Sequence, residues 1–214
     1  MRDQKQINHK GMTLIELLVG LVICAVLIGG IYRLFVAQGK AYTVQDQVVE
    51  IQQNIRTAME IVLKDLRMAG YDDDRTPAVV VPIPQIVAGD HSITLRYEKN
   101  GSLYEVAYWV DGTSRLFRQD TSNGVTNTES MLENVTGFDF AYGVDEDEDG
   151  AIDDRNGNNL VDDWILAADV GDLKIVAVRV SLTARPVQLN PDLQSVSPRT
   201  LISAVTLRNL SLLR

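Results

Sequence analysis

An acidic segment holds the residues whose types and spacing best suit metal chemistry. Residues 145–163 contain nine acids and one base, a net charge of −8, while the whole 214-residue chain carries −9. Acid or amide oxygens recur there at every second position, so a tightly coiled chain would direct them toward one point. Calcium takes about six to eight hard oxygen ligands. We therefore predict structural calcium loops, with ligands from Asp145, Asp147, Asp149, Asp153, Asp154, Asn156, Asn158 and Asp162.

The acidic segment divides into two loops, which begin at Asp145 and Asp154. Gly150 stands at the sixth place of the first loop, where calcium loops need left-handed backbone. That loop ends on Asn156, where an EF-hand has a bidentate glutamate, and no flanking helices are evident. The segment looks more like the tandem calcium loops of extracellular repeat proteins, whose dissociation constants are about 10⁻⁴ to 10⁻³ M. A solvated acidic loop without metal is the alternative.

A second feature of chemical interest is Glu16, a charged residue within an apolar run. Residues 14–32 form a 19-residue stretch with this single charge. As a helix the stretch would span roughly 29 Å, about one hydrocarbon core. Arg2, Lys5 and Lys10 precede it and favour a cytoplasmic N-terminus. A buried carboxylate requires a partner, so Glu16 calls for an explanation.

The sequence around Glu16, KGMTLIELLVG, resembles the processing site of type IV prepilins. The resemblance implies that a prepilin peptidase cuts between Gly11 and Met12 and methylates the new amino terminus. Glu16 would then be the fifth mature residue, as in that family. Met12 departs from the usual phenylalanine but is also large and apolar.

Cleavage would create an ammonium group at Met12 that suits the carboxylate of Glu16. Stacked subunits would bring Glu16 of one copy to Met12 of the next. At about 4 Å and an effective dielectric near 20, the attraction is about 4 kcal/mol before desolvation is subtracted. The pair would therefore set the register of assembly more than its stability. The alternative is an acid at a helix start that favours the helix dipole.

Helical periodicity continues beyond the apolar run. Apolar residues recur every three or four positions from Val44 to Leu66, with polar residues between them. Gly70 stands where a helix C-cap favours positive φ. We predict one helix over residues 13–69, in which residues 12–36 form the transmembrane and assembly part and residues 37–70 the amphipathic part. Glycines in the first half would weaken it locally.

Residues 71–214 have the signals of an antiparallel β-sheet domain. Residues 92–98 and 103–110 alternate with period two around a KNGS turn, which indicates a hairpin. Further strands are predicted in RLFRQ after Gly112, and over residues 135–144, 173–184 and 201–210, whereas residues 119–130 are predicted to be a surface loop. The fold class is therefore α+β, with the helix packed on the sheet.

The resemblance narrows to the PilW group of minor pilins through residues 41–71, which end in DLRMAGY, and through VTLRNL over residues 205–210. It implies a structural subunit without enzymatic activity, in a priming or tip complex. The implied partners are other minor and major pilins through the N-terminal helix, the prepilin peptidase, the assembly platform and a PilY-type adhesin. The implied location is the bacterial inner membrane, with residues 1–11 as leader, and then the pilus on the cell surface.

Composition excludes several other functions. The negative charge argues against a nucleic-acid partner. Cys24 is the single cysteine, so no intrachain disulfide forms, and two histidines leave little for a histidine-based site.

Three alternative functions stay open: a J-type minor pseudopilin of type II secretion, a membrane-tethered calcium-binding or hydrolytic domain that never polymerises, and a secreted enzyme cleaved after Gly39.

Overall fold

The computed structural model describes residues 11–73, 80–155, 157, 163–186 and 197–211. The chain divides into two compact units, residues 1–46 and residues 47–214, and helix α1 (Leu14–Leu66) contributes residues to both. In the first unit, the described residues before Leu14 belong to no helix or strand, and residues 11–43 are exposed. The helix has no break at any of its glycines. The predicted long helix is therefore confirmed, although it ends three residues earlier than expected.

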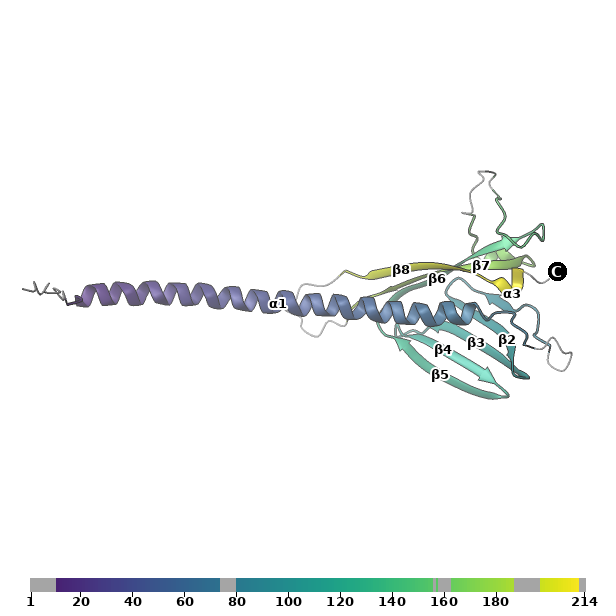
Figure 1. Ribbon diagram of the computed structural model, residues 1–214, viewed down its shortest axis with the longest axis horizontal. Helices are drawn as coiled ribbons and strands as arrows, with labels where there is room; N and C mark the ends of the chain where they lie inside the picture. The colour runs from purple at the N-terminus through teal and green to yellow at the C-terminus, as the bar shows by residue number, and fades with distance from the viewer. Residues whose placement is uncertain (1–10, 74–79, 156, 158–162, 187–196, 212–214) are drawn as a thin grey trace, which may run out of the picture. The chain divides into compact units, whose positions relative to one another are not determined.

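The second unit contains two antiparallel sheets (Figure 1). The strands of the larger sheet follow one another in chain order, and those of the smaller sheet do the same. The larger sheet comprises β1 (Ile86–Ala88), β2 (Ser92–Lys99), β3 (Ser102–Val110), β4 (Leu116–Ser122) and β5 (Val125–Leu132). The smaller sheet comprises β6 (Val135–Asp145), β7 (Lys174–Ala184) and β8 (Arg199–Thr206). Two short helices, α2 (Ala167–Val170) and α3 (Arg208–Ser211), flank β7 and β8 in sequence.

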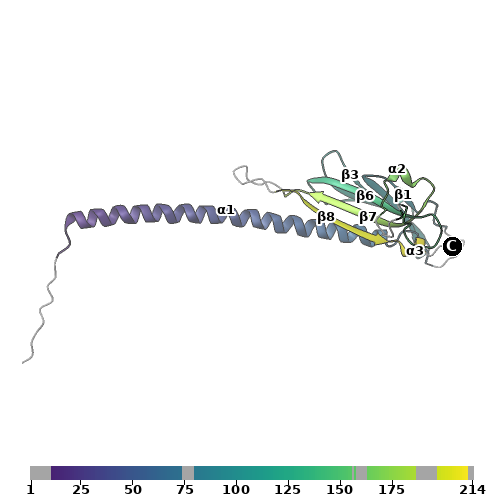
Figure 2. The same ribbon diagram turned by 90° about the horizontal axis from the view of Figure 1, so that it is seen from above.

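The core of the second unit joins the helix to both sheets. One stripe of α1, from Ile51 through Ile55 and Val62 to Leu66, is almost fully buried. It shares one hydrophobic cluster with inward-facing residues such as Val106 of the larger sheet. The same cluster includes residues of β6, β7 and β8. The views in Figures 1 and 2 agree that this part of α1 runs alongside the strands. The α+β fold predicted from the sequence is confirmed.

A buried polar network pins α1 to the larger sheet. The carboxylate of Asp65 accepts hydrogen bonds from the Tyr108 hydroxyl at 2.5 Å and from Arg118 Nε at 2.8 Å. Arg118 also contacts Asp120 at 2.6 Å. A buried carboxylate with these partners is satisfied, and its donors come from two neighbouring strands. The network therefore fixes the register of the helix against β3 and β4.

The chain leaves α1 through Gly70, which adopts the left-handed conformation predicted for it, with φ of 69°. The backbone N–H of Gly70 donates to Arg96 O, and Tyr71 O accepts from the N–H of Glu98. The segment after the helix therefore pairs with the outer side of β2, the side on which β1 continues. Gly70 thus turns the chain from helix to sheet edge.

Two predictions for the sheet domain are wrong, and one strand was missed. Residues 119–130 are not a surface loop, because they form most of the β4–β5 hairpin, whose turn has positive φ at Asn123 and Gly124. The last strand ends at Thr206, and α3 follows it. Strand β1 was not predicted. The remaining predicted strands are present, with small differences at their ends.

Candidate functional sites: the helix start and the acidic loop

The start of α1 is a capping box built by Thr13 and Glu16. One carboxylate oxygen of Glu16, Oε2, accepts from the Thr13 N–H and the Thr13 hydroxyl, each at 2.9 Å. In return the N–H of Glu16 donates to Thr13 Oγ1 at 3.3 Å. The pattern T-x-x-E before an apolar run is the sequence signal of this motif. This signal is present in the sequence, and the cap is a local role for Glu16 beyond the favourable interaction with the helix dipole.

The capping box places the acid beside the predicted processing point. Gly11 and Met12 immediately precede Thr13 and are exposed. The carboxylate of Glu16 therefore already lies against the residue that follows Met12, within its own chain. This arrangement gives the acid a local partner at the helix start. The leader before Gly11 lies outside the described residues.

The first part of α1 has the length and composition of a membrane-spanning helix. Every residue of its apolar window is classed as exposed, and the window lies near the N-terminus. Large apolar side chains such as Leu14, Ile28 and Phe35 remain more than half exposed. Exposure of this much apolar surface requires a lipid or protein environment.

The acidic loop follows β6 and brings three of the predicted calcium ligands together. Asp145, Asp147 and Asp149 each direct a carboxylate oxygen into a group whose atoms lie within 4.8 Å of one another. Gly150 has a φ of 87°, as predicted, and a Cβ there would lie 2.9 Å from the backbone oxygen of Ser211. The loop is therefore compatible only with glycine at this position.

Asp145 is the structural centre of the acidic loop. Its side chain is completely buried. Its two oxygens accept from the N–H groups of Asp149 and Gly150, at 3.1 and 3.0 Å. Lys174 Nζ lies 3.6 Å from Asp145 Oδ2. Asp147 and Asp149, by contrast, are exposed and carry the charge that a cation would neutralise.

The other predicted ligands are arranged differently. The carboxylate of Asp153 accepts from the N–H of Glu146, and Asp154 Oδ1 accepts from the N–H of Gly157 at 2.7 Å. Neither belongs to the group of three. Asn156, Asn158 and Asp162 lie outside the described residues. Ile152 anchors the loop, because its apolar side chain packs against Gly143 in β6.

Comparison with protein families gives two matches. Residues 7–32 match the prokaryotic N-terminal methylation motif, a segment that includes Gly11, Met12 and the capping box. Residues 103–208 match type IV pilus-assembly protein W, PilW. No curated protein matches the chain. Residues 41–71, on which the resemblance to PilW mainly rested, lie outside both matches, so the family signal comes from the sheet domain instead.

The methylation motif, the apolar helix and the antiparallel sheets together define a type IV pilin-like protein. The PilW match, which runs from β3 to the first residue of α3, identifies the type of pilin: the chain is a type IV pilin-like minor pilin, similar to PilW. These matches point to a structural pilus subunit, and the motif with the apolar helix supports membrane anchoring.

Proposed function

We propose that this minor pilin acts in the complex that primes pilus assembly and stays at the pilus tip. The observation that carries the proposal is the presence, in one chain, of the methylation motif and of a domain matching a pilus-assembly protein. The prepilin peptidase cuts between Gly11 and Met12 in the inner membrane. The assembly platform then extracts the processed subunit.

Other pilins are the proposed partners of the apolar part of α1. Their own N-terminal helices cover the side chains that the isolated chain leaves exposed, and the Glu16 carboxylate exchanges its bonds to Thr13 for the methylated ammonium of a neighbouring Met12. A PilY-type adhesin is the proposed partner of the sheet domain.

Deletion of the gene distinguishes this function from its rivals. Loss of pili and twitching with normal enzyme secretion supports the pilus assignment. Loss of secretion with intact pili would instead assign the chain to type II secretion, as a J-type pseudopilin. If the chain is a tethered domain that never polymerises, deletion should change neither pilus formation nor enzyme secretion. Complementation with the wild-type gene is the matched control.

We further propose that the acidic loop binds structural calcium. Three convergent carboxylates, one of them buried, support the proposal. Without a cation the exposed pair Asp147 and Asp149 repel each other beside Asp145. The ion would hold the loop in one shape at a surface available to partners.

Calorimetry on the full chain in detergent tests the calcium proposal. We expect calcium to bind with a dissociation constant of about 10⁻⁴ to 10⁻³ M. The double variant Asp147→Asn with Asp149→Asn keeps each Oδ1 acceptor and should abolish binding. Asp169→Asn, an exposed acid in α2, is the control and should bind normally. Absence of binding by the wild-type chain would exclude the site.

A further inference from the structure

Strand β1 is an edge of the larger sheet with unpaired backbone groups. In the register of the β1–β2 pair, Gln85 stands opposite Arg96, and the Arg96 N–H donates to Gln85 O. Because hydrogen-bonded pairs alternate along an antiparallel ladder, Val87 also bonds to β2, and Ile86 and Ala88 face away from it. No described residue is a partner for the outward N–H and C=O groups of Ile86 and Ala88.

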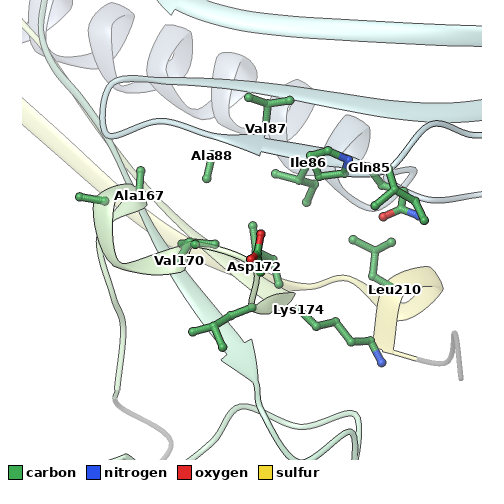
Figure 3. Close-up of a pocket in the computed structure, with 15 residues that line it drawn as sticks. Gln85, Ile86, Val87, Ala88, Ala167, Val170, Asp172, Lys174 and Leu210 are labelled. Atoms are coloured by element: carbon green, nitrogen blue, oxygen red, sulfur yellow. The ribbon is translucent and has the colours of Figure 1, made fainter.

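A groove of about 640 Å³ runs along this edge of β1. Its opposite wall comes from α2, the start of β7 and Leu210 of α3, and Figure 3 shows Val170 and Leu210 facing it. The lining is largely apolar, and Ile86 is only 4% exposed. Unpaired backbone groups in such surroundings cost free energy unless a partner satisfies them.

The unpaired backbone groups and the apolar walls of the groove indicate what kind of molecule would bind there. Outward donors and acceptors that recur every second residue are matched by the backbone of an extended polypeptide, which lies about 4.8 Å from the edge strand that it joins. The apolar walls fit apolar side chains at alternate positions. Two charged side chains line the groove: Lys174, whose Nζ lies 3.6 Å from Asp145 Oδ2, and the exposed Asp172, which pairs with no described residue. A basic side chain on the incoming segment would complement the carboxylate of Asp172.

We propose that the groove between β1 and the α2–β7 corner receives an extended segment of a partner polypeptide, which adds to the larger sheet as a further strand. The segment carries alternating apolar residues and a lysine or arginine placed near Asp172. The proposal deepens the proposed function and rests on it only for the expectation that another pilus protein supplies the strand.

Photo-crosslinking in cells of the native host tests strand addition. The probe is benzoylphenylalanine in place of Ile83, which lines the groove and is 85% exposed. We expect one covalent adduct, whose linked residues map to an extended segment of a single partner. The same probe at Val125, an exposed residue of β5 outside the groove, is the control and should not give that adduct.

Two substitutions in the groove should weaken binding of the proposed partner strand. Ala88→Pro removes an outward N–H without removing a bond to β2, and Ala168→Glu places a charge in the groove from an exposed position of α2. Each should lower the adduct yield about tenfold, the effect of losing one backbone hydrogen bond or burying a charge. Ala168→Ser should leave the yield unchanged. Thermal unfolding of each full chain in detergent verifies that the fold persists.

The proposal is overturned if the Ile83 probe gives no adduct, if the adduct maps to a helix, a lipid or a second copy of this chain, or if it persists undiminished when a folded Ala88→Pro or Ala168→Glu variant is used. The adduct is measured in membranes whether or not pili form. Failure of strand addition is therefore distinct from failure of the pilus assignment, which the gene deletion measures.

Discussion

Glu16 and Thr13 satisfy each other at the start of α1: one carboxylate oxygen accepts two hydrogen bonds from Thr13, and Thr13 Oγ1 accepts one from the N–H of Glu16. Two roles for the acid follow. As a cap it needs only an acceptor oxygen, which a glutamine also provides. As the partner of a neighbouring ammonium it needs a negative charge.

Replacement of Glu16 separates these two roles. Glu16→Gln keeps the cap and removes the charge, whereas Glu16→Ala removes both. If the charge pairs with the Met12 ammonium of another subunit, both variants should insert in the membrane and be processed, but enter pili poorly. Incorporation is measured by immunoblot of sheared pili. Normal incorporation of Glu16→Gln would show that the acid serves only as a cap.

Because Asp65 and Arg118 form a largely buried ion pair, we expect truncation of the Asp65 side chain to lower stability strongly. Asp65→Ala should lower the free energy of unfolding of the sheet domain by about 3 kcal/mol, because it leaves Arg118 and the Tyr108 hydroxyl without their shared acceptor. Urea unfolding of the full chain in detergent, followed by near-UV circular dichroism, measures this. Glu129→Gln, on the exposed strand β5, should change little. Equal stability of the two variants would refute a structural role for the network.

Tyr108 predicts an alkaline dependence of stability. Burial, together with the Asp65 carboxylate, raises the pKa of its hydroxyl above the ordinary value of 10.0. Above pH 10 the unfolded chain therefore loses this proton while the folded chain keeps it. Stability should fall as pH rises, with a slope for this group that approaches about 1.4 kcal/mol per pH unit well above pH 10. Tyr108→Phe should show a shallower decline between pH 10 and 11, and an unchanged slope would contradict the assignment.

The close packing around Gly70, just after the end of α1, leaves no room for a larger residue. A Cβ at this position would lie 2.2 Å from Leu210 Cδ2, and the backbone has positive φ. Gly101 has nearly the same φ, 71°, but a Cβ added there would meet no atom within 4 Å. Gly101→Ala should therefore cost only the left-handed penalty of about 1–2 kcal/mol, and Gly70→Ala clearly more. In a Leu210→Ala background, the extra cost of Gly70→Ala over Gly101→Ala should become smaller in thermal unfolding. Equal penalties for the two glycines would contradict the packing described.

Local signals in the sequence predicted most elements of the fold. The stripe from Val44 to Leu66 and the glycine after it predicted the helix and its end, because both signals act within a few residues. The β4–β5 hairpin was missed because β5 is polar on both faces, although Asn123 and Gly124 are a strong turn signal. Strand β1 is only three residues long and follows a proline-punctuated segment, so it offered no periodicity.

Contacts between distant residues could not be predicted from the sequence. The Asp65–Arg118 pair joins residues 53 apart, and neither residue type by itself indicates the other. The division of the eight strands found in the described residues into two sheets likewise cannot be predicted from period-two alternation. In the acidic loop, spacing did predict the convergence of Asp145, Asp147 and Asp149. It did not predict that Asp153 would turn its carboxylate to the N–H of Glu146, because that choice depends on the loop backbone.

The proposed role in the pilus depends on processing of this chain as a minor pilin. Mass spectrometry of the N-terminal peptide, from protein purified out of the native membrane, tests this processing without any intervening step. We expect a chain that begins at N-methylated Met12. A protein that retains Met1, or one that begins at Lys40 after cleavage by an ordinary signal peptidase, would exclude it.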